Sequence, residues 1–241
     1  MLRISNLRVQ IPGGPTILKN ISFEVLPGQF IAIKGASGSG KSMLLKSLAL
    51  QNKWSGGSYF FEGEDIFKQG LAGKLKIRRA VAYLEEKPAL HQNKTGLKNV
   101  SIGAVAQTPA WRRWTGMLRN DDYMGAMDTI EKLGLLDKAH QKASTMSGGE
   151  RQRIAIARAL VHGAKVIAAD EPVAGLDPHT ADRVLSDLKR LTTEQGVTVI
   201  AVLDQGDWAE RFADRIIGLN NGELVLDVKG RRLTEREKMM L

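Results

Sequence analysis

Cysteine is absent from this sequence of 241 residues, so disulfide bridges and thiolate metal sites are excluded. No apolar run is long enough to cross a bilayer, and the opening segment, MLRISNLRVQ, lacks the apolar core of a secretory signal. Internal repeats, low-complexity tracts and obvious linkers are also missing. The length suits one sizeable domain with a real hydrophobic core. We therefore expect a cytoplasmic protein of one domain, residues 1–241.

The charge balance is basic, with 35 Lys and Arg against 26 Asp and Glu and a formal net charge of +9. A basic surface can bind nucleic acid, lie near anionic lipid headgroups or simply aid solubility. The basic residues are scattered, which favours the last interpretation, and we expect no nucleic-acid partner. The densest cluster is Trp111, Arg112, Arg113 and Trp114. It suits contacts with membrane proteins or lipid, but a surface loop with one Trp packed inward fits at least as well.

Short apolar runs alternate with helical patterns, which predicts an α/β fold with a largely parallel sheet. Continuous apolar runs predict buried strands at residues 30–33, 166–169 and 197–203. Residues 2–11 and 21–25 alternate between apolar and polar side chains instead, and they predict an antiparallel β region at the N-terminus.

Helical patterns occupy the remaining segments. A helix is predicted over residues 42–50, and residues from about 88 to 163 predict an inserted helical lobe. The tail, residues 231–240, mixes charge and Met and predicts a solvated terminal helix.

A glycine-rich segment between a predicted strand and a predicted helix matches the phosphate-binding pattern GxxxxGK[ST] in full. Glycines let the backbone wrap around phosphates, and the following helix presents its positive end to the same anion. Lys41 would meet the β- and γ-phosphates, and the Ser42 hydroxyl would bind Mg²⁺. The alternative is a chance Gly- and Ser-rich turn. The loop residues are Gly35, Ala36, Ser37, Gly38, Ser39, Gly40, Lys41 and Ser42.

Two carboxylates, Asp170 and Glu171, end the predicted strand at 166–169. The carboxyl end of a parallel strand faces the ligand crevice of such a sheet. Asp170 would hold Mg²⁺, and Glu171 would orient and polarise an attacking water. A solvated strand end or a helix N-cap is the alternative.

Ser147, Gly148, Gly149 and Glu150 open a further predicted helix. Two glycines at a helix start form another potential anion-binding N-terminus. An ordinary capping box, with Glu150 three residues after Ser147, is the alternative, and both can hold at once.

The phosphate loop, the SGGE motif and the strand ending in Asp-Glu, in that order, resemble the ATPase subunits of ABC transporters. The resemblance implies a P-loop NTPase core with a mixed, mostly parallel sheet, an antiparallel N-terminal β subdomain and a helical lobe. It also implies ATP and Mg²⁺ as ligands. Ser147, Gly148 and Gly149 would complete the nucleotide site of an opposite subunit. Residues 174–177 resemble the loop that crosses the dimer interface.

The same resemblance implies a membrane permease as partner, contacted by residues 83–100, and a place at the cytoplasmic face of the inner membrane. An extracytoplasmic substrate-binding protein would take part indirectly. Residues 170–174 and 213–219 and the Trp-Arg cluster are similar to phosphonate-importer ATPases. The expected function is therefore ATP hydrolysis that drives uptake through a permease. A soluble ABC protein acting on nucleic acid usually has two cassettes or a long coiled coil, which this sequence lacks.

Five residues depart from the family pattern around the nucleotide, and one of them, Glu150 in place of Gln at the end of the SGGE motif, is a common exchange that we discount. Ile11 replaces an aromatic that stacks on adenine, and Met43 replaces a Thr at the α-phosphate. Glu86 stands where a Gln links the γ-phosphate, Mg²⁺ and the permease, and a carboxylate there can still bind Mg²⁺. Asp204 replaces a His that donates to the γ-phosphate, and an ionised Asp only accepts. Asp204 must therefore turn away, take up a proton or lie against a cation.

These departures leave two explanations for the catalytic site, which would include Glu171, Asp204 and Glu86. The chain is a homodimer with slow hydrolysis, or it is one half of an unequal pair. In the second case it would be a regulatory or degenerate module whose SGGE serves a more active partner.

Overall fold

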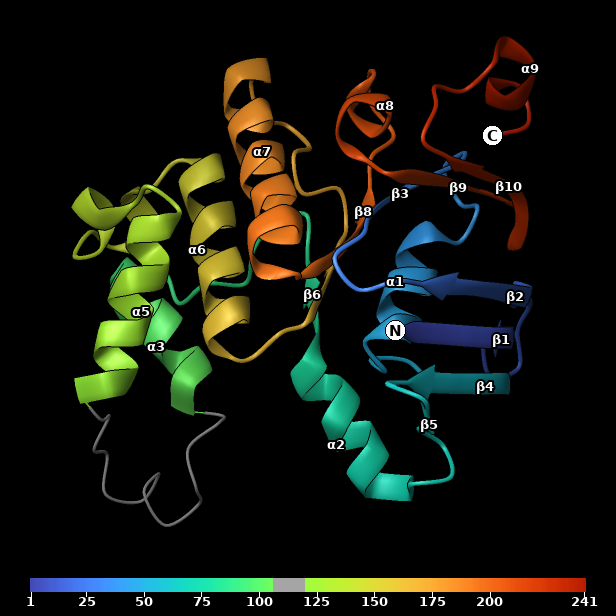
Figure 1. Cartoon of the computed structure of the whole chain (residues 1–241), viewed down its shortest axis with the longest axis horizontal. Helices are drawn as coiled ribbons and strands as arrows, with labels where there is room; N and C mark the ends of the chain where they lie inside the picture. Colours follow the sequence, from blue (N-terminus) through green and yellow to red (C-terminus); the bar gives the residue numbers. More distant parts are fainter. Residues whose placement is uncertain (106–119) are drawn as a thin grey trace.

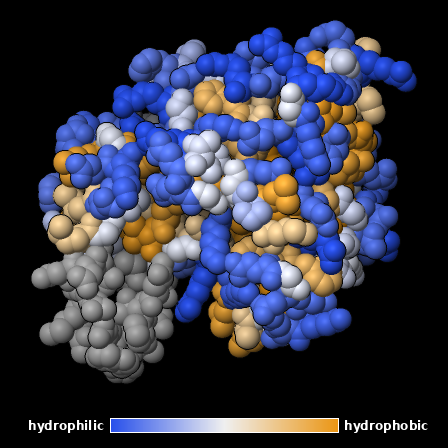
Figure 2. All heavy atoms as spheres, viewed as in Figure 1, coloured by the Kyte–Doolittle hydropathy of each residue, from blue (hydrophilic) through white to orange (hydrophobic). Residues whose placement is uncertain are grey.

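The computed structural model describes residues 1–105 and 120–241, and it contains two β-sheets flanked by helices (Figure 1). The cluster from Trp111 to Trp114 lies outside the described residues. Hydrophilic side chains cover much of the face seen in Figure 2, with apolar side chains showing between them. Within the described ranges, no helix combines the length and the apolar character that a membrane span requires.

The N-terminal residues form a four-stranded antiparallel sheet in the order β2-β1-β4-β5. Its apolar side chains alternate inward, as in β1, where Leu2, Ile4, Leu7 and Val9 are buried. The predicted antiparallel N-terminal region is confirmed, and β2 begins earlier than the predicted residue 21. The strands are β1 (Leu2–Gln10), β2 (Thr16–Val25), β4 (Gly56–Phe61) and β5 (Glu64–Asp65).

The second sheet has six strands in the order β10-β9-β3-β8-β7-β6, and only the β9–β10 pair is antiparallel. The predicted mixed, mostly parallel sheet is therefore confirmed. The strands are β3 (Phe30–Lys34), β6 (Val81–Leu84), β7 (Val166–Ala169), β8 (Thr198–Val202), β9 (Arg215–Asn220) and β10 (Glu223–Lys229).

This sheet is buried on both faces, which explains why its strands are apolar without alternation. Phe30 and Ala32 point into a core shared with the helices. Ile31 and Ile33 point into a second core beneath the antiparallel sheet, where they pack with residues of helix α1 (Lys41–Leu48) such as Leu44. The six-stranded sheet therefore lies between two separate cores.

Helices α3, α5 and α6 pack against one another on the side remote from the antiparallel sheet (Figure 1). They fall within residues 88–163, where the inserted lobe is expected, and the division of the chain at those bounds stays a prediction. The helices are α1 (Lys41–Leu48), α2 (Gly70–Ala80), α3 (Gly96–Val105), α5 (Asn120–Lys132), α6 (Gly148–Val161), α7 (Pro178–Gln195), α8 (Trp208–Phe212) and α9 (Glu235–Lys238).

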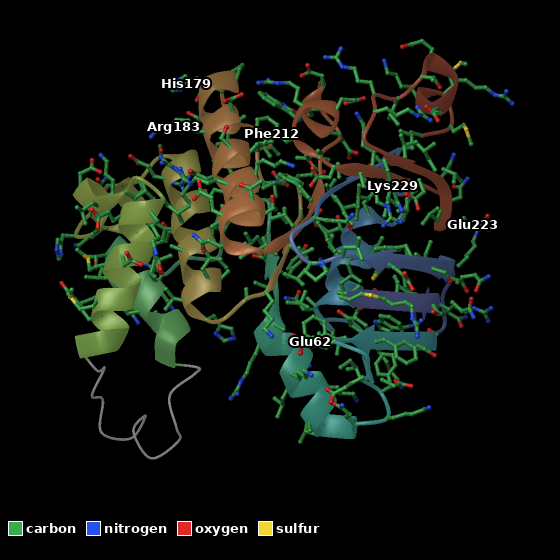
Figure 3. The ribbon with its side chains drawn as sticks, viewed as in Figure 1. Glu62, His179, Arg183, Phe212, Glu223 and Lys229 are labelled. Atoms are coloured by element: carbon green, nitrogen blue, oxygen red, sulfur yellow. The ribbon has the colours of Figure 1, made fainter. Side chains whose placement is uncertain are left out.

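Glu62, which is labelled in Figure 3, lies just after β4 and forms ion pairs with two lysines. Its carboxylate lies 3.2 Å from Lys76 on α2 and 2.5 Å from Lys165, which precedes β7. The hydrogen bonds from Lys165 and Lys76 hold the pKa of Glu62 below its usual range. The carboxylate therefore stays charged at neutral pH and keeps both contacts.

The terminal helix is shorter than expected, because α9 spans only Glu235–Lys238. Its own residues are not buried, but the segments around it are anchored. Leu233 is buried, and Leu241 packs against the core on the helical side of the sheet. The expectation of a solvated tail over residues 231–240 is wrong for Leu233, because this side chain joins the core on the helical side of the sheet.

Candidate active site

The phosphate-loop segment lies between β3 and α1. At two of its glycines, other atoms lie so close to the backbone that a side chain would not fit. Gly35 has φ 155°, and an added Cβ would lie 2.1 Å from the Leu219 carbonyl oxygen. Gly40 has φ 104°, and its Cβ would lie 2.8 Å from Leu18 Cδ2. Gly38 has φ 81°, but a Cβ there would meet no atom within 4 Å. One side of the loop is thus packed, and the other side is open at Gly38.

Helix α1 begins at Lys41 with Gly40 as its N-cap, and no side chain caps it. The first-turn amide groups of a helix have no acceptor within the helix. No acidic residue lies in this first turn. The positive end of α1 is therefore free to receive an anion such as a phosphate.

Lys41 is 7% exposed, and its ammonium group has three acceptors. It donates to the carbonyl oxygens of Gly35 at 2.7 Å and Ala36 at 2.9 Å. Its third contact is an ion pair at 3.0 Å with Asp204 Oδ2, just beyond the end of β8. Of the three outcomes expected for Asp204, the structure shows the contact with a cation. The other oxygen, Oδ1, is buried and accepts no hydrogen bond from the described residues.

Asp170 follows β7 and is 9% exposed. Its Oδ1 accepts a hydrogen bond from Ser42 Oγ at 3.0 Å, and its Oδ2 accepts one from the Tyr83 hydroxyl at 2.8 Å. Burial and the Asp170 carboxylate raise the pKa of Tyr83, so the phenol remains a donor.

The pair of Ser42 and Asp170 fits Mg²⁺ chemically. A hydroxyl and a carboxylate are hard oxygen donors, and Mg²⁺ typically takes one or two protein carboxylates and completes its shell with phosphates and water. Among the described residues no group of three or more His, Asp or Glu side chains could hold a metal.

Glu171 has φ 46°, a left-handed conformation that is uncommon for a residue other than glycine. Partial burial raises the pKa of its carboxyl group, and nearby negative charges raise it further. These charges are Asp204, Glu86 and Asp170, and only Lys41 opposes them. The structure thus places Asp204 and Glu86 close enough to Glu171 to act on its carboxyl group. A carboxylate with a raised pKa is a better base at neutral pH.

The SGGE motif begins helix α6 with a complete capping box. Ser147 Oγ accepts from the Glu150 amide at 3.3 Å, and Glu150 Oε2 accepts from the Ser147 amide at 2.8 Å. A Cβ on Gly149 would lie 2.2 Å from Thr180 Cγ2, and one on Gly148 would lie 2.8 Å from a Leu176 methyl group. The capping-box interpretation is confirmed, and the role of Ser147, Gly148 and Gly149 in an opposite subunit stays a prediction.

Two predicted nucleotide contacts have less support from the geometry. Ile11 is 43% exposed in the turn between β1 and β2. Met43 packs against the core beneath the antiparallel sheet, and its Sδ lies 2.7 Å from Asn52 Nδ2. The roles of both residues at the adenine and the α-phosphate stay predictions.

Two contacts of the site are made by residues that lie outside the sequence motifs. The Tyr83 contact with Asp170 arises because β6 lies beside β7, with Tyr83 opposite Ala168. The Ala36 amide donates to the Leu241 carbonyl oxygen at 2.7 Å, so the tail supports the loop. Tyr83 is expected only in the stretch of residues 83–100 that resembles a permease contact, and Leu241 follows the charged tail, so neither residue is expected at this site.

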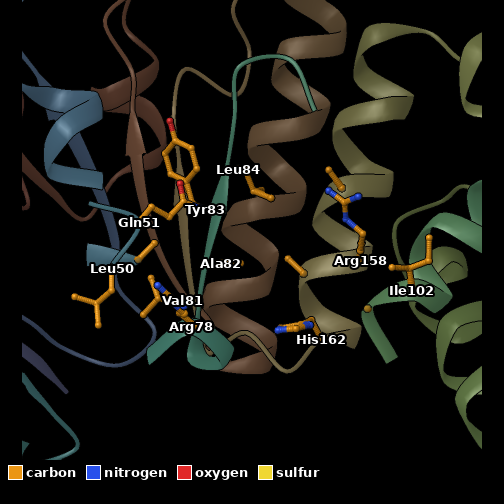
Figure 4. A pocket seen from close by; sticks show the side chains of 14 residues that line it. Leu50, Gln51, Arg78, Val81, Ala82, Tyr83, Leu84, Ile102, Arg158 and His162 are labelled. Carbon is orange, nitrogen blue, oxygen red and sulfur yellow. The ribbon is translucent and has the colours of Figure 1, made fainter. Parts of the chain in front are cut away.

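A groove of about 620 Å³ lies beside the site, between β6, α3, α6 and the segment after α1 (Figure 4). Apolar residues such as Leu50 and Ile102 form part of its wall, and Tyr83 is another lining residue. Its basic side chains are Arg78, Arg158 and His162. The groove therefore offers both apolar contact and positive charge.

Three features together define a nucleotide-binding cassette. They are a phosphate loop before α1, a Ser and Asp pair that could bind a metal, and a second helix that begins at SGGE. The ABC transporter family model matches residues 18–174. The chain belongs to the ABC transporter family. It is similar to the phosphonates import ATP-binding protein PhnC of Staphylococcus aureus, with 36% identity over 251 aligned positions that cover 99% of this chain and 98% of the relative.

Solved structures of ABC cassettes share the fold. The dimeric cassette MJ0796 bound to ADP and Pi is 29% identical, with a TM-score of 0.81 over 97% of this chain and 100% of that one. CbiO1 of Clostridium perfringens, part of the transporter complex cbiONQ, is 26% identical, with a TM-score of 0.83 over 95% of this chain and 88% of that one.

Proposed function

We propose that this chain binds and hydrolyses ATP as the motor subunit of an importer for phosphonates or phosphate esters. The observation that carries the proposal is the convergence of Lys41, Ser42, Asp170 and Glu171 at the phosphate loop and the start of α1. Their chemistry is that of phosphoryl transfer to water. The similarity to PhnC along nearly the full length of both chains supports the substrate class.

The residues have separate tasks in this reaction. Lys41 and the start of α1 hold the phosphates, while Ser42 and Asp170 would hold Mg²⁺, with Glu86 as a further candidate ligand. Bound Mg²⁺ would neutralise charge on the phosphate oxygens. Glu171 orients a water whose oxygen bonds to the γ-phosphorus as the bond to the bridging oxygen breaks. The products are ADP and inorganic phosphate, and the water proton passes to Glu171 or to the released phosphate.

The partners follow from the same proposal. Two cassettes would face each other, so that Ser147, Gly148 and Gly149 of one chain close the nucleotide site of the other. The groove of Figure 4 would receive a helix of the membrane permease, because its apolar wall suits an amphipathic helix and its basic groups suit acidic side chains or a helix C-terminus. The chain would then lie at the cytoplasmic face of the membrane, with a substrate-binding protein on the opposite side.

A second function is favoured by the ion pair between Lys41 and Asp204. The pair engages the lysine that should hold the phosphates, and an ionised Asp204 offers them no donor. On this alternative the chain is a regulatory module that binds nucleotide with little turnover of its own and completes the site of a more active cassette.

The test measures binding and turnover separately in the full chain. Millimolar Mg-ATP should raise the thermal midpoint, because a ligand that binds the native state stabilises it. Lys41→Ala should remove most of this shift, whereas Lys53→Ala, which removes an exposed charge, should keep it. An unchanged midpoint in the parent protein would refute nucleotide binding. A shift without phosphate release, alone or with a permease, would support the regulatory alternative.

A further inference from the structure

Tyr83 is the least expected member of the site. Strand β6 lies parallel to β7, with Tyr83 opposite Ala168, and the Asp170 amide donates to the Leu84 carbonyl oxygen at 2.8 Å. This pairing brings the Tyr83 hydroxyl within 2.8 Å of Asp170 Oδ2. The contact is therefore fixed by the register of two neighbouring strands.

The two oxygens of Asp170 receive one donor each. Ser42 Oγ donates to Oδ1 at 3.0 Å from α1, and Tyr83 donates to Oδ2 from β6. A carboxylate held at both oxygens cannot rotate freely about its terminal torsion, which is otherwise broad. The two donors come from different elements, α1 and β6, so together they fix the plane of the carboxylate.

The ring of Tyr83 is held as well. It packs against the core beneath the antiparallel sheet, and Lys46 Nζ of α1 lies 5.7 Å from its centroid. The ring therefore does not depend on the hydroxyl for its place. A change to Phe removes the hydrogen bond and leaves the ring contacts, which makes Tyr83 suitable for a clean test.

We propose that Tyr83 is a positioning residue that orients Asp170 for Mg²⁺, an inference that rests on the proposed Mg-ATP function. Donors that hold a metal-binding carboxylate fix its orientation, and their loss typically weakens metal binding by about tenfold or more. Tyr83 does not itself touch the metal in this proposal. Its effect should appear in the Mg²⁺ requirement of nucleotide binding and be absent from nucleotide binding without metal.

The experiment titrates Mg²⁺ against the full chain with a fluorescent ATP analogue and follows binding at equilibrium. Tyr83→Phe should raise the half-saturating Mg²⁺ concentration by about tenfold. Its affinity for the analogue in EDTA should equal that of the parent protein. Single-turnover hydrolysis at saturating Mg²⁺ should recover most of the parent rate.

The matched control is Tyr59→Phe. Tyr59 is fully buried, and its hydroxyl donates to the Leu48 carbonyl oxygen at 2.8 Å, in the core away from Asp170. This variant should lower the thermal midpoint but leave the Mg²⁺ titration unchanged.

The outcomes separate the two proposals. If the parent protein shows no Mg²⁺-dependent binding, the proposed function fails. If the parent is Mg²⁺-dependent and Tyr83→Phe has the same half-saturation, Tyr83 does not position Asp170. A Tyr83→Phe variant that loses affinity equally with and without Mg²⁺ would show a structural role only and would also overturn the inference.

Discussion

The ion pair between Lys41 and Asp204 predicts that Asp204 competes with ATP. The ammonium group that should hold the β- and γ-phosphates lies 3.0 Å from Asp204 Oδ2. A bound nucleotide must replace Asp204 as the partner of Lys41. The Asp204 carboxylate then faces the phosphates. Asp204→Asn keeps the shape of the side chain and removes its charge, so it should tighten ATP binding.

The magnitude follows from the distance and the burial of the pair. At 3.0 Å and an effective dielectric near 20, the attraction is about 5.5 kcal/mol. The cost of desolvating the two side chains, which are 8% and 29% exposed, offsets most of this. A residual of about 1 to 2 kcal/mol corresponds to roughly a tenfold lower Kd for Mg-ATP.

Asp204→Asn should also destabilise the protein when no nucleotide is bound, although it tightens ATP binding. Lys41 keeps the carbonyl oxygens of Gly35 and Ala36 but loses its only charged partner among the described contacts. The free energy of unfolding without nucleotide should therefore fall, by about 1 to 3 kcal/mol. A lower midpoint without ligand together with a lower Kd distinguishes competition from general damage.

Equilibrium binding of Mg-ATP and thermal unfolding measure the two effects. Asp207→Asn is the control, because it makes the same change of charge three residues further on, at an exposed position. If Asp204→Asn and Asp207→Asn have the same Kd as the parent protein, the ion pair does not compete with nucleotide and the reasoning is wrong.

Hydrolysis gives an independent measure of the same site. Asp204→His replaces an acceptor by a potential donor at the γ-phosphate, and such a donor can contribute about a hundredfold in rate. Single-turnover hydrolysis should therefore be faster in Asp204→His, and Glu171→Gln in the same background should abolish the gain. An Asp204→His variant that is no faster at equal ATP affinity would count against the weakened-site interpretation.

Three further predictions concern the adenine, an ion pair and a helix contact. Ile11→Tyr should tighten ATP binding by about 1 kcal/mol through stacking, and unchanged affinity would mean that residue 11 is not at the base. The Arg215 guanidinium holds the pKa of Asp227 below its usual range, so this pair stabilises the fold above about pH 4 and loses its effect as the pH falls through the folded-state pKa. Asp227→Asn should thus lower the free energy of unfolding by about 1 to 2 kcal/mol at pH 7, a figure already reduced for the exposure of Asp227. The difference in denaturant midpoint between this variant and the parent protein should become smaller in acid. Gly149→Ala should cost about 1 to 3 kcal/mol by contact with Thr180 Cγ2, and Thr180→Ser should restore stability only in the Gly149→Ala background.

Local patterns in the sequence were sufficient for much of this fold. The apolar runs at residues 30–33 and 166–169 coincide with β3 and β7 within one residue, because strands buried on both faces need apolar side chains throughout. The phosphate loop was equally accessible, since Gly35, Gly38 and Gly40 lie close together in the chain and match a pattern of fixed spacing. The short tail helix was harder to predict, because a charged segment does not indicate which of its neighbouring leucines is buried.

Contacts between distant segments could not be predicted in the same way. The sequence left three outcomes for Asp204, and only the adjacency of β3 and β8 brings it to Lys41. Tyr83 is part of an apolar strand whose pattern describes burial, not the target of a hydroxyl. Its contact with Asp170 depends on the order and register of β6 and β7, which no local pattern encodes.

The support of the phosphate loop from the far end of the chain has a consequence for folding. Gly35 packs closely against the Leu219 carbonyl oxygen. The Gly222 amide donates to the Ser39 carbonyl oxygen, and the Ala36 amide donates to the Leu241 carbonyl oxygen. These partners emerge from the ribosome long after the loop itself, so the loop must wait for β9, β10 and the tail before it can take its final shape. Contacts of such long sequence separation form late and slow the folding of a domain. A refolding chain should therefore regain its secondary structure before it regains affinity for nucleotide.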